Sequence, residues 1–386
     1  MLNFDKPAAQ NLVKVPAELM DLEDYKGPIY GYIREDSGVH VILGWKGNEP
    51  LEALNTSKIG KIGKEVTEGI FGIRNNGKLE FILRMPDKAD VPLGVDCDAY
   101  GNKGFTLIQN VFSRQKGLIE TEYMLNKTVV IAGCGSVGSA MALQLARAGV
   151  GRFFLADTDV VDIHNICRHQ CNITDIGDYK VYALKKRIQQ INPYADIKAT
   201  PKLIQDSEHE LTGYLGKDAV IIGAGDNRLS AAVCNDIAIE HGIPFISLGF
   251  WTRACVGEIF TWLPDQEQVC YRCALHEAVE NSMKVMNRNY FYIGEEAAEK
   301  ASFEPGLGID VEFGSTIASK IVIDMLNRNN SEYIPRVIHT LTQYTWVCNT
   351  NEEAIGGVSA TMFPYPLDIA RNIVFDESIE CNHKHV

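Results

Sequence analysis

Long hydrophobic runs are absent from this sequence of 386 residues. No stretch approaches the roughly 18 unbroken apolar residues of a membrane-spanning helix. The first ten residues also lack the basic-then-apolar pattern of a signal peptide. A basic surplus is missing as well, because the formal net charge is −13, which argues against a general nucleic-acid-binding surface. We therefore expect a cytoplasmic protein that contacts neither membranes nor nucleic acids.

Internal repeats and low-complexity tracts are missing too, and the length suits two domains. In residues 1–105, apolar runs at 40–43 and 79–83 lie among turn-forming clusters such as Asn-Asn-Gly-Lys at 75–78. This pattern predicts short strands and hairpins, and we expect a smaller N-terminal α+β domain. It would either bind a substrate or partner protein or mediate dimerisation. Residues 106–386 would form the larger domain.

The larger domain shows alternating strand and helix patterns from Lys127 onward. Apolar runs predict strands, and amphipathic stretches predict helices, the second of which stops at Asn192-Pro193. This alternation is typical of a doubly wound, Rossmann-like α/β domain with a mostly parallel sheet, which binds nucleotides at the carboxyl ends of its strands. The expected strands cover 128–132, 153–156 and 218–222, and the expected helices cover 139–148 and 180–191.

A glycine-rich turn follows the first of these strands. Gly133, Gly135 and Gly138 have the spacing G-x-G-x-x-G between a strand and a helix, where small residues let the backbone approach phosphates. Asp157 follows about 20 residues later, where a carboxylate suits ribose hydroxyls. Taken alone, this motif fits NAD or FAD as well as ATP.

Two cations and a further carboxylate favour a nucleoside triphosphate. Arg168 and Lys180 could neutralise a triphosphate and its leaving pyrophosphate. Asp226, just after a strand, could hold magnesium. Hydride transfer has no need of such a cluster, so an NAD oxidoreductase is the weaker interpretation.

Several motifs agree in order and spacing with those of a known family. Asp157-Thr158-Asp159 precedes Asn165 and Arg168, Lys180 opens a helix that ends at Asn192-Pro193, and Asp226-Asn227 follows a strand. Upstream lies Ser113-Arg114-Gln115, and downstream lies Cys270-Tyr271-Arg272-Cys273. Over residues 110–386 the chain resembles the ThiF/MoeB/MccB family of adenylyltransferases, which are similar to ubiquitin-activating enzymes.

This resemblance implies an ATP- and magnesium-dependent enzyme that adenylates a carboxylate within a homodimer. A carboxylate oxygen would attack the α-phosphorus and release pyrophosphate, without a general base. The implied roles are the phosphate turn for Gly133, Gly135 and Gly138, the ribose for Asp157 and Asp159, the nucleotide for Asn165, the phosphates for Arg168 and Lys180, magnesium for Asp226, and the partner subunit's site for Arg114.

Cys270 and Cys273 supply half of a tetrahedral zinc site. The family usually adds a second C-x-x-C near its C-terminus, whereas here Cys381 stands close to His383 and His385. We expect a zinc hairpin completed by Cys381 and one of these histidines. A metal-free pair and a redox pair are the alternatives. The pair follows a strand-like run instead of opening a helix beside a βαβ unit, which disfavours the redox interpretation.

Many relatives carry a nucleophilic cysteine on the loop after the zinc pair, but residues 274–308 contain none. The usual thioester is therefore in doubt. The acyl-adenylate would pass directly to a partner, or Ser302 would replace the thiol, or a nitrogen–phosphorus bond would form as in MccB-type enzymes. Cys134, Cys167 and Cys171 are expected to be small filler residues at close-packed turns near the nucleotide.

Three hypotheses for the substrate remain at this point. The first is the C-terminal carboxylate of a ubiquitin-like protein in a bacterial conjugation or sulfur-transfer pathway, with a conjugating enzyme as a further partner. The second is MccB-like modification of a ribosomally made peptide, which the N-terminal extension and the missing loop cysteine would suit. The third is a non-catalytic scaffold subunit, which the joint presence of Arg168, Lys180 and Asp226 disfavours.

Overall fold

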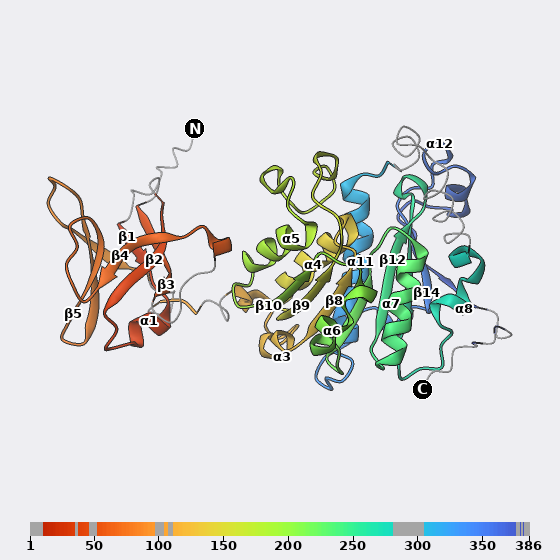
Figure 1. The fold of residues 1–386 in the computed structure, drawn as a ribbon, viewed down its shortest axis with the longest axis horizontal. Helices are drawn as coiled ribbons and strands as arrows, with labels where there is room; N and C mark the ends of the chain where they lie inside the picture. The colour runs from red at the N-terminus through yellow and green to blue at the C-terminus, as the bar shows by residue number, and fades with distance from the viewer. Residues whose placement is uncertain are drawn as a thin grey trace. The chain divides into compact units, whose positions relative to one another are not determined.

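The computed structural model of the chain describes residues 11–34, 38–45, 52–96, 104–106, 111–280, 305–375, 379 and 381. The chain divides into two compact units, Met1–Lys116 and Gly117–Val386 (Figure 1).

The first unit is a closed β-barrel with strand order β1-β3-β2-β4-β5-β6-β7. Strands β1 and β7 close it by pairing in parallel, and its interior is filled by apolar side chains such as Ile29, Ile42 and Phe81. Its described part holds one α-helix, α1 (Ala17–Asp21), so the expected α+β mixture is β almost throughout. The strands are β1 (Leu12–Lys14), β2 (Gly27–Arg34), β3 (Val39–Trp45), β4 (Ser57–Ile62), β5 (Gly69–Asn75), β6 (Lys78–Arg84) and β7 (Val91–Val95).

The predicted turn at 75–78 is confirmed as the connection between β5 and β6. Asn75 faces Lys78 across this antiparallel pair, and both central residues are left-handed, with φ of 52° at Asn76 and 77° at Gly77. Asparagine and glycine tolerate this backbone better than other residues, which is why they favour two-residue hairpins.

The second unit contains an eight-stranded sheet with the order β10-β9-β8-β11-β12-β13-β14-β15. The first five strands in this order are parallel, and the last three join antiparallel. The expected doubly wound, mostly parallel α/β sheet is confirmed. The strands are β8 (Thr128–Ala132), β9 (Arg152–Ala156), β10 (Asp196–Thr200), β11 (Ala219–Gly223), β12 (Phe245–Phe250), β13 (Val256–Trp262), β14 (Tyr344–Cys348) and β15 (Ile369–Ile373).

Helices cover both faces of this sheet (Figure 1). Alternate residues of β8 explain why, since Val129 and Ile131 pack in one apolar cluster while Val130 and Ala132 pack in the other. The first cluster contains α4, α5 and α11, and the second contains α6 and α7. The helices are α3 (Thr121–Leu125), α4 (Ser136–Arg147), α5 (Lys180–Gln189), α6 (Glu208–Leu211), α7 (Arg228–Glu240), α8 (Tyr271–Ala274), α11 (Gly308–Leu326) and α12 (Glu353–Gly356).

The chain order places a topological switch point between β8 and β11. From β8 the chain proceeds outward to β9 and β10, and then returns to the other side of β8 to form β11. Ligands of doubly wound sheets bind outside the carboxyl ends of the strands at such a point. The glycine-rich turn after β8 and Asp226 after β11 both lie there. Within the described ranges, no helix combines the length and apolarity that crossing a bilayer requires.

Candidate functional site

The turn after β8 brings the backbone unusually close to the neighbouring loop. Gly133 has a φ of 92°, and a Cβ on it would lie 2.6 Å from the carbonyl carbon of Ala224. A Cβ on Gly138 would lie 1.9 Å from the carbonyl oxygen of Gly133. Larger residues would therefore separate the turn both from α4 and from the loop after β11.

The N-terminus of α4 faces open space among the residues that the structure describes. Gly135 is its N-cap residue, and no described side chain caps the helix. A Cβ on Gly135 would meet no described atom within 4 Å. Amide groups at an uncapped helix N-terminus attract anions through their unpaired N–H groups and the helix dipole. The expected phosphate turn therefore has the geometry of an anion site.

Asp157 directly follows β9, and its carboxylate is hydrogen-bonded to the backbone of this turn. One carboxylate oxygen accepts the N–H of Cys134 at 2.6 Å, and the other accepts the N–H of Asp159 at 2.8 Å. Burial raises the pKa of Asp157, and the two backbone hydrogen bonds oppose that shift. Asp157 thus joins the turns after β8 and β9. The family resemblance implies that Asp157 also binds the ribose, in addition to making these two hydrogen bonds.

Lys180 and Asp159 form an ion pair beside this turn. Nζ of Lys180 lies 2.7 Å from Oδ2 of Asp159, and the side chain of Lys180 is 11% exposed while that of Asp159 is 65% exposed. The N–H of Lys180 also donates to the carbonyl of Asp159. Sequence reasoning assigned these residues to phosphate and ribose, and the structure brings their two side chains together as an ion pair.

Asn165 and Arg168 belong to a short turn between β9 and α5. Oδ1 of Asn165 accepts the N–H of Asp162 at 2.9 Å, and the N–H of Arg168 donates to the carbonyl of Asn165 at 3.0 Å. Gly308, at the start of α11, packs so closely here that an added Cβ would lie 2.9 Å from the carbonyl of Cys167. The segment that carries Arg168 is therefore held against α11.

Asp226 follows β11 and is exposed. Its Oδ1 accepts a hydrogen bond from Nδ2 of Asn227 at 3.3 Å. Asn227 is also the N-cap of α7, because its Oδ1 accepts the N–H of Ser230. A lone exposed carboxylate at a strand end fits magnesium, which usually takes one or two carboxylates together with phosphate oxygens and water.

His169 is a component of the turn that sequence reasoning did not single out. It is 7% exposed, its Nε2 lies 2.7 Å from the carbonyl oxygen of Cys134, and its Nδ1 accepts the N–H of Cys171 at 3.0 Å. Burial lowers the pKa of His169. The position of His169 directly after Arg168 was the sequence signal for its role. Its contact with the carbonyl of Cys134 could not be read from the sequence, because the two residues are 35 positions apart.

The cysteines around the turn differ in exposure. Cys134 and Cys171 are buried, and burial raises the pKa of the Cys134 thiol and raises that of Cys171 to about 12. Both fit the expected filler role. Cys167 does not, because it is exposed, although its carbonyl lies close to Gly308 of α11. Ser302 lies outside the described residues.

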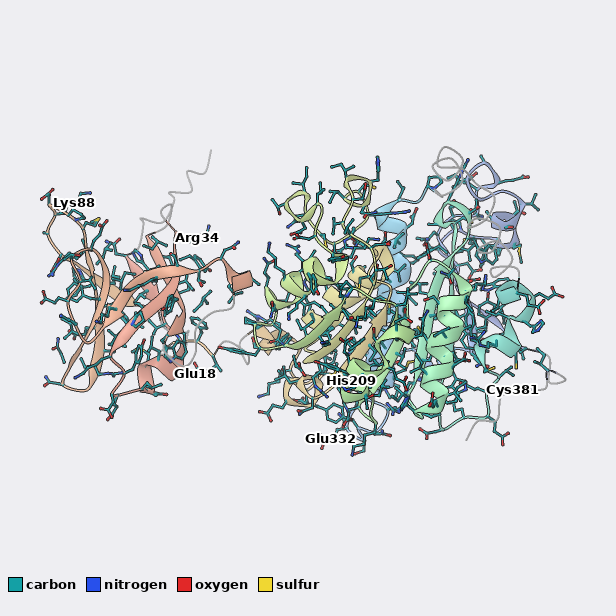
Figure 2. The ribbon with its side chains drawn as sticks, in the orientation of Figure 1. Glu18, Arg34, Lys88, His209, Glu332 and Cys381 are labelled. Carbon is teal, nitrogen blue, oxygen red and sulfur yellow. The ribbon has the colours of Figure 1, made fainter. Side chains whose placement is uncertain are left out.

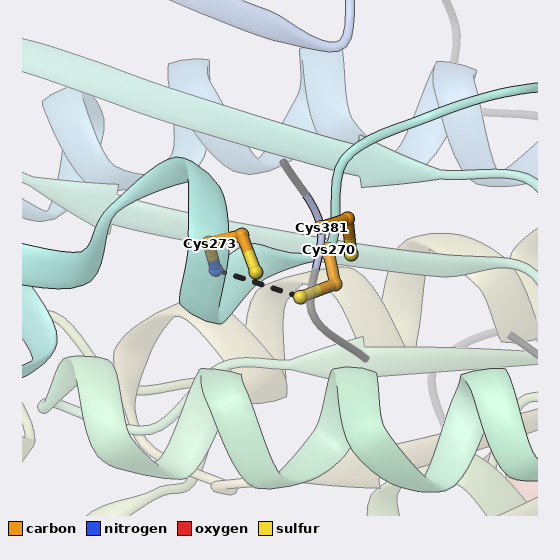
Figure 3. A group of neighbouring side chains, drawn as sticks. All are labelled: Cys270, Cys273 and Cys381. Atoms are coloured by element: carbon orange, nitrogen blue, oxygen red, sulfur yellow. Dashed lines mark hydrogen bonds between the residues drawn. The ribbon is translucent and has the colours of Figure 1, made fainter. Parts of the chain in front are cut away.

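The three predicted cysteine ligands of zinc lie close together. One sulfur atom each from Cys270, Cys273 and Cys381 falls within 4.8 Å of the other two (Figure 3). Sulfur atoms that share a tetrahedral zinc ion lie about 3.8 Å apart, given zinc–sulfur bonds of about 2.3 Å. The three thiols therefore fit one zinc ion. His383 and His385 lie outside the described residues.

The cysteine pair differs from the expected hairpin, because Cys270 is the N-cap of the short helix α8 and Cys273 lies within that helix. This segment is attached to α7 and to the end of β14. Oδ1 of Asn235 accepts the N–H of Tyr271 at 2.7 Å, and Arg272 pairs with Asp236 at 2.7 Å. Gln343 donates to the carbonyl of Val269 at 2.6 Å. Such contacts hold the backbone of the cysteine pair in one orientation.

Arg114 belongs to a different part of the chain. It lies in the short 3₁₀ turn Ser113–Gln115, which is within the first compact unit. The partner-subunit role that the resemblance implies stays a prediction.

The doubly wound sheet places the N-terminus of α4 and several charged side chains at its switch point, which defines a Rossmann-like α/β fold with a candidate anion site. Residues 109–349 match the ThiF family, and the chain belongs to that family. The resemblance inferred from the sequence motifs is thereby confirmed.

The chain is similar to two curated proteins, one named as an adenylyltransferase and one as a dehydratase. The sulfur carrier protein ThiS adenylyltransferase of Bacillus subtilis is 35% identical over 153 residues, which cover 38% of this chain and 43% of that protein. The tRNA threonylcarbamoyladenosine dehydratase of the same organism is 40% identical over 132 residues, covering 33% and 50%. The chain thus spans about half the length of these curated relatives. Among solved structures, E. coli MccB aligns at 17% identity with a TM-score of 0.45, covering 59% of this chain and 62% of MccB.

Proposed function

We propose that this protein uses magnesium-ATP to adenylate the C-terminal carboxylate of a ubiquitin-like protein. The observation that carries the proposal is the convergence, at one switch point, of an open helix N-terminus with the Lys180–Asp159 pair and Asp226. Triphosphate chemistry needs an anion site, cations and a magnesium ligand together. Membership of the ThiF family and the name of the ThiS relative support the same activity.

In this proposal the chain acts by positioning and by neutralising charge. Gly133, Gly135 and Gly138 let the turn approach the phosphates, while Arg168 and Lys180 stabilise the negative charge that develops as pyrophosphate leaves. Magnesium, held by Asp226, would add charge neutralisation at the phosphate oxygens. The substrate carboxylate is itself the nucleophile: its oxygen bonds to the α-phosphorus, and the bond from that phosphorus to the bridging oxygen of pyrophosphate breaks.

ATP–pyrophosphate exchange tests the activity and the substrate class together. Purified protein is offered ubiquitin-like proteins that end in a free glycine and, separately, short peptides that end in asparagine. We expect exchange with a ubiquitin-like protein, reduced about a hundredfold or more in Arg168→Ala because a phosphate-neutralising cation is lost. Arg147→Ala is the matched control, since Arg147 is an exposed residue in the last turn of α4, at the end away from the glycine turn.

The pattern of exchange separates the competing functions. Exchange with the peptides alone would replace the proposal with MccB-like peptide modification. Tight magnesium-ATP binding without exchange would indicate a scaffold subunit. Equal exchange in Arg168→Ala and in the wild type would remove Arg168 from the reaction while leaving the activity in place.

We also propose that Cys270, Cys273 and Cys381 bind a structural zinc ion. The support is the mutual proximity of the three sulfur atoms and the hydrogen bond from the N–H of Cys273 to the sulfur of Cys270 at 3.5 Å, drawn in Figure 3. Burial raises the pKa of the Cys270 thiol, so a bound cation would be needed to keep it as a thiolate. His383 or His385 is the proposed fourth ligand.

Replacing Cys273 by serine should remove the metal and destabilise the second unit. We expect zinc to fall from about one ion per chain to well below half. The apparent Tm should fall by roughly 5–10 °C, as the loss of about 2–3 kcal/mol of binding-linked stability implies. Metal analysis and thermal unfolding measure both. Cys167→Ser is the control, because Cys167 is exposed and outside this cluster, and zinc-free wild-type protein would contradict the site.

Residues 1–105 are proposed as an accessory domain that binds the substrate protein or a conjugating enzyme, or that mediates dimerisation, and residues 106–386 as the adenylation domain. In a homodimer, Arg114 would reach the partner subunit's nucleotide. A truncation beginning at Thr106 that activated the substrate with an unchanged KM would contradict substrate binding by the barrel.

A further inference from the structure

Both backbone groups of Cys134, the residue between the first two glycines, are held by side chains. Its N–H donates to Oδ2 of Asp157 at 2.6 Å, and its carbonyl oxygen lies 2.7 Å from Nε2 of His169. The thiol of Cys134 is fully buried. The residue at the centre of the turn is thus restrained on every side.

The second contact of His169 defines its tautomer. Nδ1 accepts the N–H of Cys171 at 3.0 Å, so Nδ1 carries no proton and the proton of a neutral imidazole is on Nε2. Nε2–H therefore donates to the carbonyl of Cys134. Burial lowers the pKa of His169, which favours the neutral ring that this bond pattern requires.

The carbonyl of Cys134 and the N–H of Gly135 belong to one peptide group. The described peptide bonds are all trans, so these two groups point in opposite directions. Because the carbonyl points at buried His169, the N–H of Gly135 points away from it. Gly135 is the N-cap of α4, and a Cβ on it would meet no atom of the described residues within 4 Å.

Glycine makes the opposite orientation of this peptide accessible. Gly135 tolerates both signs of φ, so the peptide could rotate and turn the carbonyl oxygen toward the open side. An oxygen there would repel a phosphate, whereas an N–H donates to it. Something must therefore select one orientation, and the hydrogen bond from His169 does so.

We infer that His169 is a positioning residue that holds the Cys134–Gly135 peptide with its N–H directed at the nucleotide's phosphates. The inference rests on the proposed function, because it presupposes that the turn binds a nucleoside triphosphate. His169 touches neither nucleotide nor substrate and acts through the backbone. It explains why a buried imidazole stands directly after Arg168: one short turn supplies both a cation and the bond that orients the phosphate-binding peptide.

The test compares His169→Leu and His169→Gln with the wild type in binding of magnesium-ATP and of adenosine, measured by calorimetry well below each Tm. Leucine fills the space without a donor, and we expect it to weaken ATP binding about tenfold or more. It should leave adenosine binding within about threefold, since adenosine has no phosphate. Glutamine offers a donor and an acceptor on one planar group and should restore most of the ATP affinity. His209→Leu, at an exposed histidine (Figure 2), is the control.

The outcomes separate this inference from the proposed function. Wild-type protein that binds ATP while His169→Leu binds it equally well would overturn the inference and leave the function standing. Equal losses for ATP and adenosine would show a general structural role and would overturn it too. Wild-type protein that does not bind ATP would overturn both. If His169→Leu does not fold, nitrogen NMR of the wild type decides, because a proton on Nδ1 of His169 is incompatible with the proposed orientation.

Discussion

Asp226→Ala should abolish adenylation while leaving the fold intact. We expect ATP–pyrophosphate exchange to fall by about a thousandfold or more, which corresponds to about 4 kcal/mol of transition-state stabilisation. The reason is that Asp226 is the proposed protein ligand of magnesium, which would supply charge neutralisation for the leaving pyrophosphate. Stability should change little, because the side chain is exposed and its hydrogen-bond partner is the neighbouring Asn227.

Two measurements and a matched control variant make this prediction specific. Exchange rates across a magnesium titration should show that Asp226→Ala loses activity at every magnesium concentration or recovers only at high concentration. Thermal unfolding should place its Tm within a few degrees of the wild type. Asp206→Ala is the matched control, since Asp206 is an exposed aspartate in the turn Ile204–Ser207 and belongs to none of the motifs. Full activity in Asp226→Ala would contradict the magnesium role.

Lys180→Met should cause the second large loss. Methionine keeps most of the buried stem and removes the charge, so we expect kcat/KM for ATP to fall about a hundredfold to a thousandfold. The effect on folding should be smaller, because the partner carboxylate of Asp159 is 65% exposed and can be solvated by water when its cation is gone. Steady-state exchange kinetics at varied ATP concentrations measure the change.

Asp159→Asn is the companion variant for Lys180→Met. If Asp159 mainly orients Lys180, this variant keeps the cation and should lose much less activity than Lys180→Met does. If Asp159 holds the ribose as the family resemblance implies, its loss should appear chiefly as a higher KM for ATP. Lys180→Met with unchanged kcat/KM would contradict the proposal that Lys180 neutralises phosphate charge.

The local elements were largely predictable because their patterns are local. The run at 128–132 is buried along its whole length, as the central strand β8 must be between two helical layers. The helix from Lys180 begins at the predicted residue and ends close to Asn192-Pro193. The family could be inferred as well, because its motifs depend on residue identity and spacing along the chain, both of which can be read without coordinates.

The barrel was harder to predict than the nucleotide-binding domain. Short apolar runs between turns indicate strands, but the closure of β1 on β7 depends on pairing between segments that are far apart in the sequence. The exposure of Cys167 also escaped prediction, since a small residue in a turn can face either the interior or the solvent. Packing of this turn against Gly308 of α11 decides whether the side chain of Cys167 faces the interior or the solvent.

The amino-acid sequence by itself determined the α/β class, the glycine turn, the ThiF family and the candidate residues for phosphate, magnesium and zinc. Tertiary structure alone decided how these residues are combined. It pairs Lys180 with Asp159, brings Cys381 to Cys270 and Cys273, and aims His169 at the carbonyl of Cys134. The physical reason is that spacing along the chain specifies contacts within one strand or helix, whereas hydrogen bonds and metal sites form between segments that only the folded sheet brings together.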